Sequence, residues 1–270
     1  MSLKFVDSHC HLDMLDLAEF DDHMDNVIKL AGQNQVSDIL SIAVDLESFP
    51  RVLETAKIYP NVYASVGLHP CHSPEKVVTM EQLSALADDS KVIAIGETGL
   101  DYYMNEGSDP QDQNFEWQRE RFRIHIKTAI QTAKPLIIHT RDAKDDTLRI
   151  LQEENAHKIG GIMHCFVEDL ETAEKALEMG FYISFSGIVT FKNAKAIQAV
   201  AKAVPDDRLL IETDAPYLAP VPMRGKKNQP AYVAHVAQFL AELRGVSLAH
   251  IAGITRENYF RLFKLNDPVI

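Results

Sequence analysis

The chain has 270 residues, of which 46% are hydrophobic and 24% are charged. This is an ordinary globular composition, and the length suits one large barrel or two smaller domains. The formal net charge of −12 argues against broad, non-specific binding of duplex nucleic acid, because such binding needs a basic face. It leaves room for an enzyme that holds a strand end through metals and a few local cations.

No apolar run approaches the ~20 residues needed to cross a bilayer, and no leader-like segment opens the chain. Cys10, Cys71 and Cys165 cannot all pair with one another and form no CxxC motif, so we expect reduced thiols. These features predict a cytoplasmic protein with no membrane contact and no obligate protein partner.

Short apolar runs alternate with longer amphipathic ones along the chain. Runs such as Val92–Ile95 and Leu136–Ile138 are continuous, which is typical of parallel strands buried on both faces. The expected strands, in chain order, are Lys4–Ser8, Asp38–Val44, Val62–Gly67, Val92–Gly96, Leu136–His139, Gly161–His164, Tyr182–Ser186 and Leu209–Glu212.

Helix signals fill the intervals between these strands. They are a capping box at Thr79 and Gln82, a long helix over Phe115–Thr132, Asp169 as the cap of Leu170–Met179, and Asn193 as the cap of a helix ending before Pro205. About eight strand-then-helix units indicate a closed (β/α)8 TIM barrel of the α/β class. We expect one domain over residues 1–270. The alternative, an open doubly wound sheet, would have a glycine-rich turn after its first strand, but Ser8-His9-Cys10-His11 stands there instead.

Metal-binding residue types gather where the expected strands end. They are His9 and His11 at the first strand, Glu97 at the fourth, His139 at the fifth, His164 at the sixth and Asp214 at the eighth. In a parallel barrel these ends form one ring at the face where active sites lie. Because side chains alternate along a strand, His9 and His11 point to one side and Cys10 to the other. A lone buried histidine is usually a hydrogen-bonded core residue, but independent core histidines would not all gather at one end.

Six ligands exceed the three that a single catalytic zinc takes from the protein. Two divalent cations about 3.5–4 Å apart accommodate them if a carboxylate bridges the pair. We expect Glu97 to bridge, with His9, His11 and Asp214 on one cation and His139 and His164 on the other. Mg²⁺, Mn²⁺ and Zn²⁺ all suit such ligands. A single cation, with His139 or His164 outside its ligand shell, is the alternative.

Asp214 is the expected acceptor of a proton from the metal-activated water, and Glu97 is the second catalytic candidate. His69 ends the third strand and is expected to hold substrate phosphate or to protonate the leaving group; a structural histidine before Pro70 is the alternative. Asp7 and Glu212 are expected to orient imidazoles or to satisfy buried polar groups.

Cations near the site are candidates for binding substrate. Arg224 and Lys226 lie in the proline-rich segment Pro216–Pro230, which we expect to act as a phosphate clamp, with a solvated turn as the alternative. Arg141 and Asp101 follow strand ends and are expected to orient Glu97 or His139 or to contact phosphate, with an exposed salt bridge in the loop as the alternative. The polar loop Tyr102–Phe115 is expected at the edge of the pocket.

At these residues the sequence resembles the TatD-type deoxyribonucleases, a branch of the metal-dependent amidohydrolase superfamily. The resemblance implies a TIM barrel, divalent metals at the six positions above, and hydrolysis of phosphodiesters, often from a DNA 3′ end. The matching motifs run nearly end to end and are Asp7-Ser8-His9-Cys10-His11-Leu12, Val66-Gly67-Leu68-His69-Pro70, Gly96-Glu97-Thr98-Gly99-Leu100-Asp101-Tyr102, Ile138-His139-Thr140-Arg141, His164-Cys165-Phe166, Glu212-Thr213-Asp214-Ala215-Pro216-Tyr217-Leu218 and Arg224-Gly225-Lys226.

We therefore expect a metal-dependent hydrolase that removes nucleotides from the 3′ end of single-stranded DNA, with RNA as a further substrate. Its expected partners are DNA strand ends or other nucleotide-containing molecules. An amide or lactone hydrolase with the same metals is the alternative, although Arg224, Lys226 and Lys227 favour phosphate. A non-catalytic binding protein is a third reading, against which the complete ligand set speaks.

Overall fold

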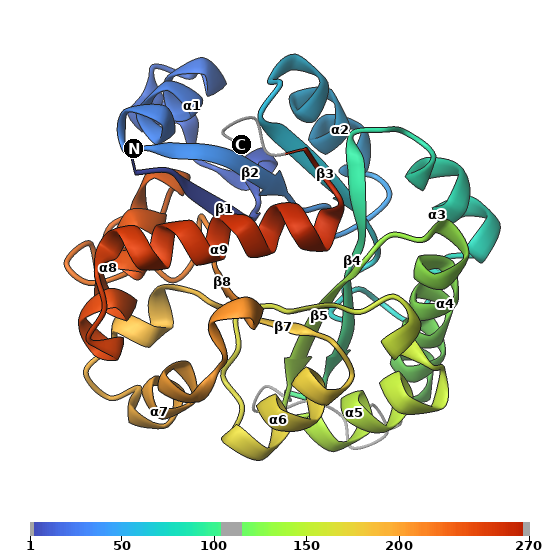
Figure 1. The fold of residues 1–270 in the computed structure, drawn as a ribbon. Helices are drawn as coiled ribbons and strands as arrows, with labels where there is room; N and C mark the ends of the chain where they lie inside the picture. Colours follow the sequence, from blue (N-terminus) through green and yellow to red (C-terminus); the bar gives the residue numbers. More distant parts are fainter. Residues whose placement is uncertain (1–2, 104–114, 267–270) are drawn as a thin grey trace.

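The computed structural model describes residues 3–103 and 115–266. Eight parallel strands form one sheet in the order β1 to β8, with helices alternating around it, as Figure 1 shows. This is the predicted (β/α)8 barrel. The strands are β1 Phe5–Cys10, β2 Val36–Ser41, β3 Val62–Val66, β4 Val92–Asp101, β5 Leu136–Arg141, β6 Gly161–Met163, β7 Tyr182–Phe185 and β8 Leu209–Ile211.

The helices surround the barrel, except for the last one, which crosses one of its ends. They are α1 Met24–Gln33, α2 Phe49–Ile58, α3 Met80–Ala87, α4 Glu116–Thr132, α5 Lys144–Glu153, α6 Leu170–Glu178, α7 Lys195–Ala203, α8 Val233–Arg244 and α9 Leu248–Phe263. None of the helices described is long and apolar enough to cross a membrane. Most of the expected loop Tyr102–Phe115, residues 104–114, lies outside the described residues.

Two predicted caps are confirmed and one is wrong. Thr79 and Gln82 form the capping box of α3, and Asp169 accepts a hydrogen bond from the Thr172 N–H at the start of α6. Asn193 does not cap α7, whose N-cap is Ala194. Ala194 there closes a turn by donating its N–H to the Phe191 carbonyl at 3.0 Å, so the helix begins later than Asn193 could cap.

Strand β4 is longer than predicted. It continues past Gly96 to Asp101, because Thr98–Asp101 pair with Ile138–Arg141 of β5. The barrel closes through the segment that follows β8. There the Asp214 N–H donates to the His9 carbonyl at 2.9 Å and the His11 N–H donates to the Ala215 carbonyl at 2.8 Å. The predicted ligands of β1 and β8 are therefore brought together by the closure itself.

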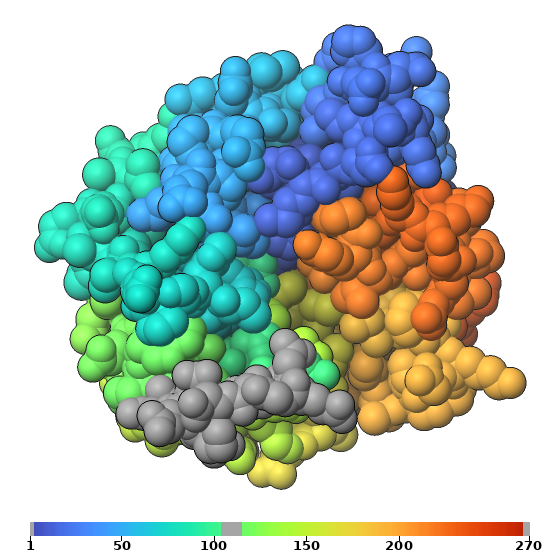
Figure 2. Space-filling model, turned by 180° about the vertical axis from the view of Figure 1, so that it is seen from behind, coloured from blue at the N-terminus to red at the C-terminus, as the bar shows by residue number. Residues whose placement is uncertain are grey.

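The inside of the barrel holds its own apolar core. Its members include Val6 of β1, Leu40 of β2, Ile137 of β5 and Leu210 of β8, and side chains of α9 join them. Figure 1 shows α9 crossing the barrel, and its contacts with β1 and β8 close this end. The functional site is left at the opposite end, where Figure 2 shows the surface hollowed near its centre.

Candidate metal centre

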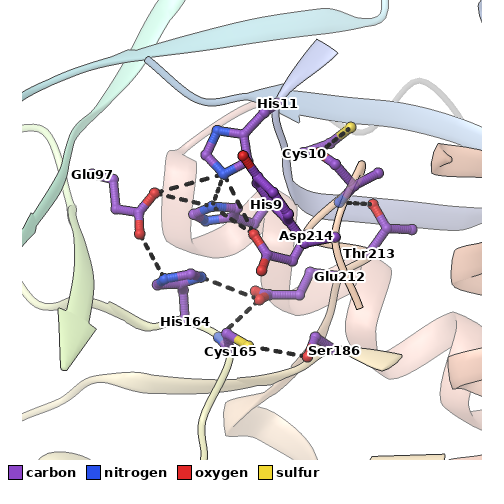
Figure 3. Close-up of polar contacts among 12 residues, drawn as sticks. His9, Cys10, His11, Glu97, His164, Cys165, Ser186, Glu212, Thr213 and Asp214 are labelled. Atoms are coloured by element: carbon purple, nitrogen blue, oxygen red, sulfur yellow. Dashed lines mark hydrogen bonds and ion pairs between the residues drawn. The ribbon is translucent and has the colours of Figure 1, made fainter. Parts of the chain in front are cut away.

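The carboxyl ends of β1 and β8 bring their ligand atoms together with one from β4. His9 Nε2 lies 3.3 Å from His11 Nε2, and these nitrogens lie 3.5 and 3.4 Å from Asp214 Oδ1. Glu97 Oε2 lies 3.4 and 3.8 Å from the same two nitrogens. Figure 3 shows the four side chains pointing toward one another. Bonds of about 2.0–2.1 Å at tetrahedral angles separate ligand atoms by about 3.3–3.4 Å, so this set fits one divalent cation.

The other oxygen of Glu97 faces a second group of imidazoles. Oε1 lies 2.9 Å from His164 Nε2 and 3.3 Å from His139 Nδ1. The His164 ring also stacks on that of His9, with ring centroids 3.9 Å apart. Glu97 thus occupies the place that a bridge between two cations requires. The number and identity of the cations stay predictions.

The outer nitrogens of His139 and His164 face further carboxylates. His139 Nε2 lies 2.9 Å from Asp101 Oδ2, and His164 Nδ1 lies 3.3 Å from Glu212 Oε1. Because carboxylates accept hydrogen bonds, these outer nitrogens carry protons and the inner nitrogens of neutral rings present lone pairs to Glu97. A lone pair and a carboxylate repel unless a proton or a cation lies between them. The donor set therefore fits a divalent metal.

His69 has the opposite arrangement of donor and acceptor. Its Nδ1 accepts a hydrogen bond from the Cys71 N–H at 3.1 Å, which leaves the proton of the neutral ring on Nε2, 3.2 Å from Glu97 Oε1. Burial, the main influence, lowers the pKa of His69 and favours this neutral form. A protonated nitrogen cannot bind a metal but can donate a hydrogen bond. His69 therefore suits the predicted role at substrate better than that of a ligand.

Burial and the neighbouring imidazoles set the charge of the two ligating carboxylates. Burial would raise the pKa of Glu97, but the charge on His164 and the interactions with the other surrounding imidazoles lower it well below its usual range. Burial likewise opposes ionisation of Asp214, but the hydrogen bond with His11 and nearby imidazole charge lower its pKa. Both carboxylates are thus ionised at neutral pH, as ligands must be.

A cavity of about 660 Å³ opens over these ligands. The predicted site residues that line it are His11, His69, Glu97, His139, Arg141, His164 and Asp214. His9 lies beneath them and is fully buried. Arg141 is the sole Lys or Arg among the described residues that line the cavity.

The two remaining predicted residues, Arg224 and Lys226, are exposed but are not among the residues lining the cavity. The Arg224 guanidinium lies 3.9 Å from the ring centroid of Phe191. The neighbouring Lys227 forms an ion pair with Asp16. The proposed phosphate clamp is therefore partly engaged in contacts within the protein, and it stays a prediction.

The expected orienting residues take different roles. Glu212 orients an imidazole, as described for His164. Asp7 instead accepts hydrogen bonds from the N–H and the hydroxyl of Thr213, at 2.8 and 2.6 Å. Asp7 therefore satisfies polar groups next to Asp214 and fixes the backbone at the start of that segment.

Two buried residues of α4, not among the predicted site residues, hold the loop that carries His69. The Arg121 guanidinium donates to the carbonyls of Ser73 at 2.9 Å and Lys76 at 2.7 Å. His125 accepts the Leu68 N–H on Nε2 at 3.0 Å and contacts the Arg121 carbonyl through Nδ1 at 2.8 Å. Their four-residue spacing, which puts both on one face of a helix, is the signal that could have indicated them.

Comparison with known proteins identifies the family. A profile of the family described as TatD related DNase matches residues 6–264. The chain belongs to the TatD family. The uncharacterized metal-dependent hydrolase YcfH of Escherichia coli K12 is 46% identical over 261 residues, which cover 97% of this chain and 96% of YcfH. The uncharacterized metal-dependent hydrolase YabD of Bacillus subtilis is 43% identical over 264 residues, covering 96% of this chain and 99% of YabD.

Solved structures agree with this assignment. The crystal structure of YjjV, a TatD homolog from Escherichia coli K12, matches with a TM-score of 0.87 at 31% identity and covers 98% of this chain and 100% of that one. The predicted family and barrel are therefore confirmed, and this TatD-family protein is a metal-dependent hydrolase. Because YcfH and YabD are described as uncharacterized, the substrate has to be inferred from the site.

Proposed function

We propose that this TatD-family protein hydrolyses phosphodiester bonds at the 3′ end of single-stranded DNA, with RNA as a further substrate. The observation that carries the proposal is the position of Glu97, whose two oxygens face two groups of ligand atoms beneath an open cavity. Two bridged cations suit a phosphoryl displacement, in which an attacking and a leaving oxygen both need stabilising. The family description as TatD related DNase supports the same substrate class.

Each catalytic residue has a role that its contacts support. Bound divalent cations would lower the pKa of the attacking water and neutralise charge on the phosphate. Asp214, ionised and lining the cavity, accepts the proton that the water loses. His69 donates a hydrogen bond from its Nε2 to a phosphate or leaving oxygen. One P–O bond forms from water, one ester P–O bond breaks, and the leaving oxygen departs as an alcohol with the proton that Asp214 accepted.

Arg141 supplies positive charge at the wall of the cavity. Its guanidinium lies over the ring of Tyr103, 3.6 Å from the centroid, and a stacked guanidinium keeps its N–H donors at its edge, where a phosphate can accept them. Arg224 and Lys226 follow the lining residues Tyr217 and Leu218 closely in sequence. We propose that these two cations contact the DNA backbone beyond the nucleotide that is removed.

The test uses metal-loaded protein with single-stranded oligonucleotides labelled at either end, together with a panel of lactones and amides. Stepwise shortening from the 3′ end is the expected result. Glu97→Gln protein purified in parallel controls for contaminating nuclease. Hydrolysis of a lactone or amide with both oligonucleotides left intact would replace the proposal with the carbonyl-hydrolase alternative.

A further inference from the structure

The lining of the cavity is polar around the metal ligands and apolar beside them. The loops after β3, β4 and β5 contribute polar groups, among them His69, Asp101 and Arg141. The loops after β1, β6, β7 and β8 contribute a set of apolar side chains that we call the apolar wall. It consists of Met14, Val167, Ile188, Tyr217 and Leu218. Metal ligands and a phosphate need no such wall, so it indicates an apolar group in the substrate.

Tyr217 is the large aromatic side chain of this wall, and it is 54% exposed. Its ring lies edge-on to the imidazole of His11, with centroids 6.1 Å apart. The described contact of its hydroxyl is a weak one, at 3.9 Å from Sδ of Met14. A ring this exposed contributes little to the folded core, but it presents a flat apolar face immediately beside a metal ligand.

The backbone that presents Tyr217 is firmly held. Buried Asn228 donates through Nδ2 to the carbonyls of Thr213 at 2.8 Å and Tyr217 at 2.5 Å. Gly187 packs directly against Leu218, the residue after Tyr217, since a Cβ added to Gly187 would lie 1.9 Å from the Leu218 carbonyl oxygen. The ring is therefore presented without the loss of backbone freedom that a mobile loop would suffer on binding.

We propose that Tyr217 is the stacking platform for the 3′-terminal nucleobase, and that the apolar wall selects substrates whose reacting phosphate carries a base nearby. This inference rests on the proposed nuclease function and deepens it. A base lying on Tyr217 is next to His11, so its phosphate reaches the ligands around Glu97. Since every base has a π face, the platform senses the presence of a base rather than its identity.

The test compares two single-stranded oligonucleotides that differ at the 3′ end, one with an ordinary nucleotide and one with a base-free tetrahydrofuran residue. The measured quantity is the ratio of kcat/KM for the first substrate to that for the second. We expect wild-type protein to prefer the base-bearing end, and Tyr217→Ala to lower the ratio about 5- to 150-fold, the factor that stacking contributes per base. Tyr217→Phe keeps the ring and should keep the preference. Ile58→Ala, which shortens an exposed apolar side chain on α2, is the matched control and should leave the ratio unchanged.

The outcomes separate this inference from the function on which it rests. Cleavage of neither oligonucleotide by metal-loaded wild-type protein would overturn both. Cleavage of both ends at equal rates by the wild type, or an equal loss on both substrates in Tyr217→Ala, would overturn the stacking platform and leave the nuclease proposal standing. A similar preference among the four terminal bases, lost together in Tyr217→Ala, would support it further.

Discussion

The two ends of the barrel are made by the same eight strands and have opposite chemistry. At the amino ends, Tyr259, Phe260 and Phe263 of α9 complete an apolar core. At the carboxyl ends, imidazoles and carboxylates are buried against one another, and within the described chain Nδ1 of His9 and of His11 finds no hydrogen-bond partner. Burying such groups lowers the free energy of unfolding, and burial of the apolar core at the closed end offsets this loss. We therefore expect substitutions at the two ends to alter stability and catalysis separately.

Removing the metal should have the largest effect, and only at the open end. We expect a chelator to abolish hydrolysis, and Mg²⁺ or Mn²⁺ to restore it, because no residue of the site can replace a cation between Glu97 and the imidazoles. Far-UV circular dichroism should show the barrel still folded. Full activity in excess chelator, with no metal in elemental analysis, would contradict the metal centre.

Two isosteric substitutions should separate proton transfer from metal binding at the open end. Asp214→Asn keeps an oxygen for the metal but cannot accept a proton, so we expect kcat to fall by ~10²–10⁴-fold with metal retained. Glu97→Gln should release metal as well as activity, because it removes the bridge. Metal content, substrate Kd and kcat are measured for both. An Asp214→Asn enzyme with its metals and near-native kcat would exclude Asp214 as the base.

Phe263→Ala should affect only the closed end. Phe263 packs on Tyr259 with ring centroids 4.8 Å apart, and truncating a buried Phe costs about 3–5 kcal/mol of the free energy of unfolding. Because we propose one domain over residues 1–270, urea unfolding should remain a single transition at lower urea, with kcat of the folded protein unchanged. Tyr259→Phe is the control, since that hydroxyl is buried with no partner in the described part of the chain. A large fall in kcat for Phe263→Ala would show that the ends are coupled.

Metal binding should release protons at the open end. Burial opposes protonation of His139 and His164. Nearby carboxylates nevertheless raise the pKa of both in the metal-free site: Asp101 and Glu97 act on His139, and Glu97 and Glu212 act on His164. A metal must displace these protons, so its affinity should rise with pH by about tenfold per unit for each proton released. Titration of Mn²⁺ at several pH values measures this slope. His125, whose pKa burial lowers to about 4, stays neutral and should not contribute. An affinity independent of pH would contradict the assignment of inner nitrogens as ligands.

The smallest effect is expected from the cations outside the cavity. Neutralising Arg224, Lys226 and Lys227 should raise KM for oligonucleotides a few-fold and flatten its dependence on salt. Lys227 should account for the least of the change, because it pairs with Asp16. Lys127→Gln on the outer helix α4 is the control. An unchanged salt slope in the triple variant would exclude the clamp.

The open end was largely predictable from the sequence because strand periodicity and ligand chemistry coincide there. Apolar runs located the strands, and His9, Glu97, His139 and Asp214 stood at or beyond their ends. What the sequence did not indicate depends on distance across the fold. Asp101 was expected to orient a ligand, and the extension of β4 brings it to His139. The support of the His69 loop by Arg121 was not indicated, because it needed α4 to lie against that loop. The prediction that Asn193 caps α7 was wrong, because residue preferences at helix ends do not reveal the turn that precedes this helix.

The position of α9 has a consequence for how the protein is made. Its residues close the inner core against β1 and β8, the first and last strands, yet a ribosome adds them only after all eight strands. Until they emerge, Val6, Leu40 and Ile137 have no cover at that end of the barrel. A nascent chain that has made all eight strands but not α9 therefore displays an apolar surface, the kind of surface to which chaperones bind. Closure of this end of the barrel therefore has to wait until α9 has been synthesised.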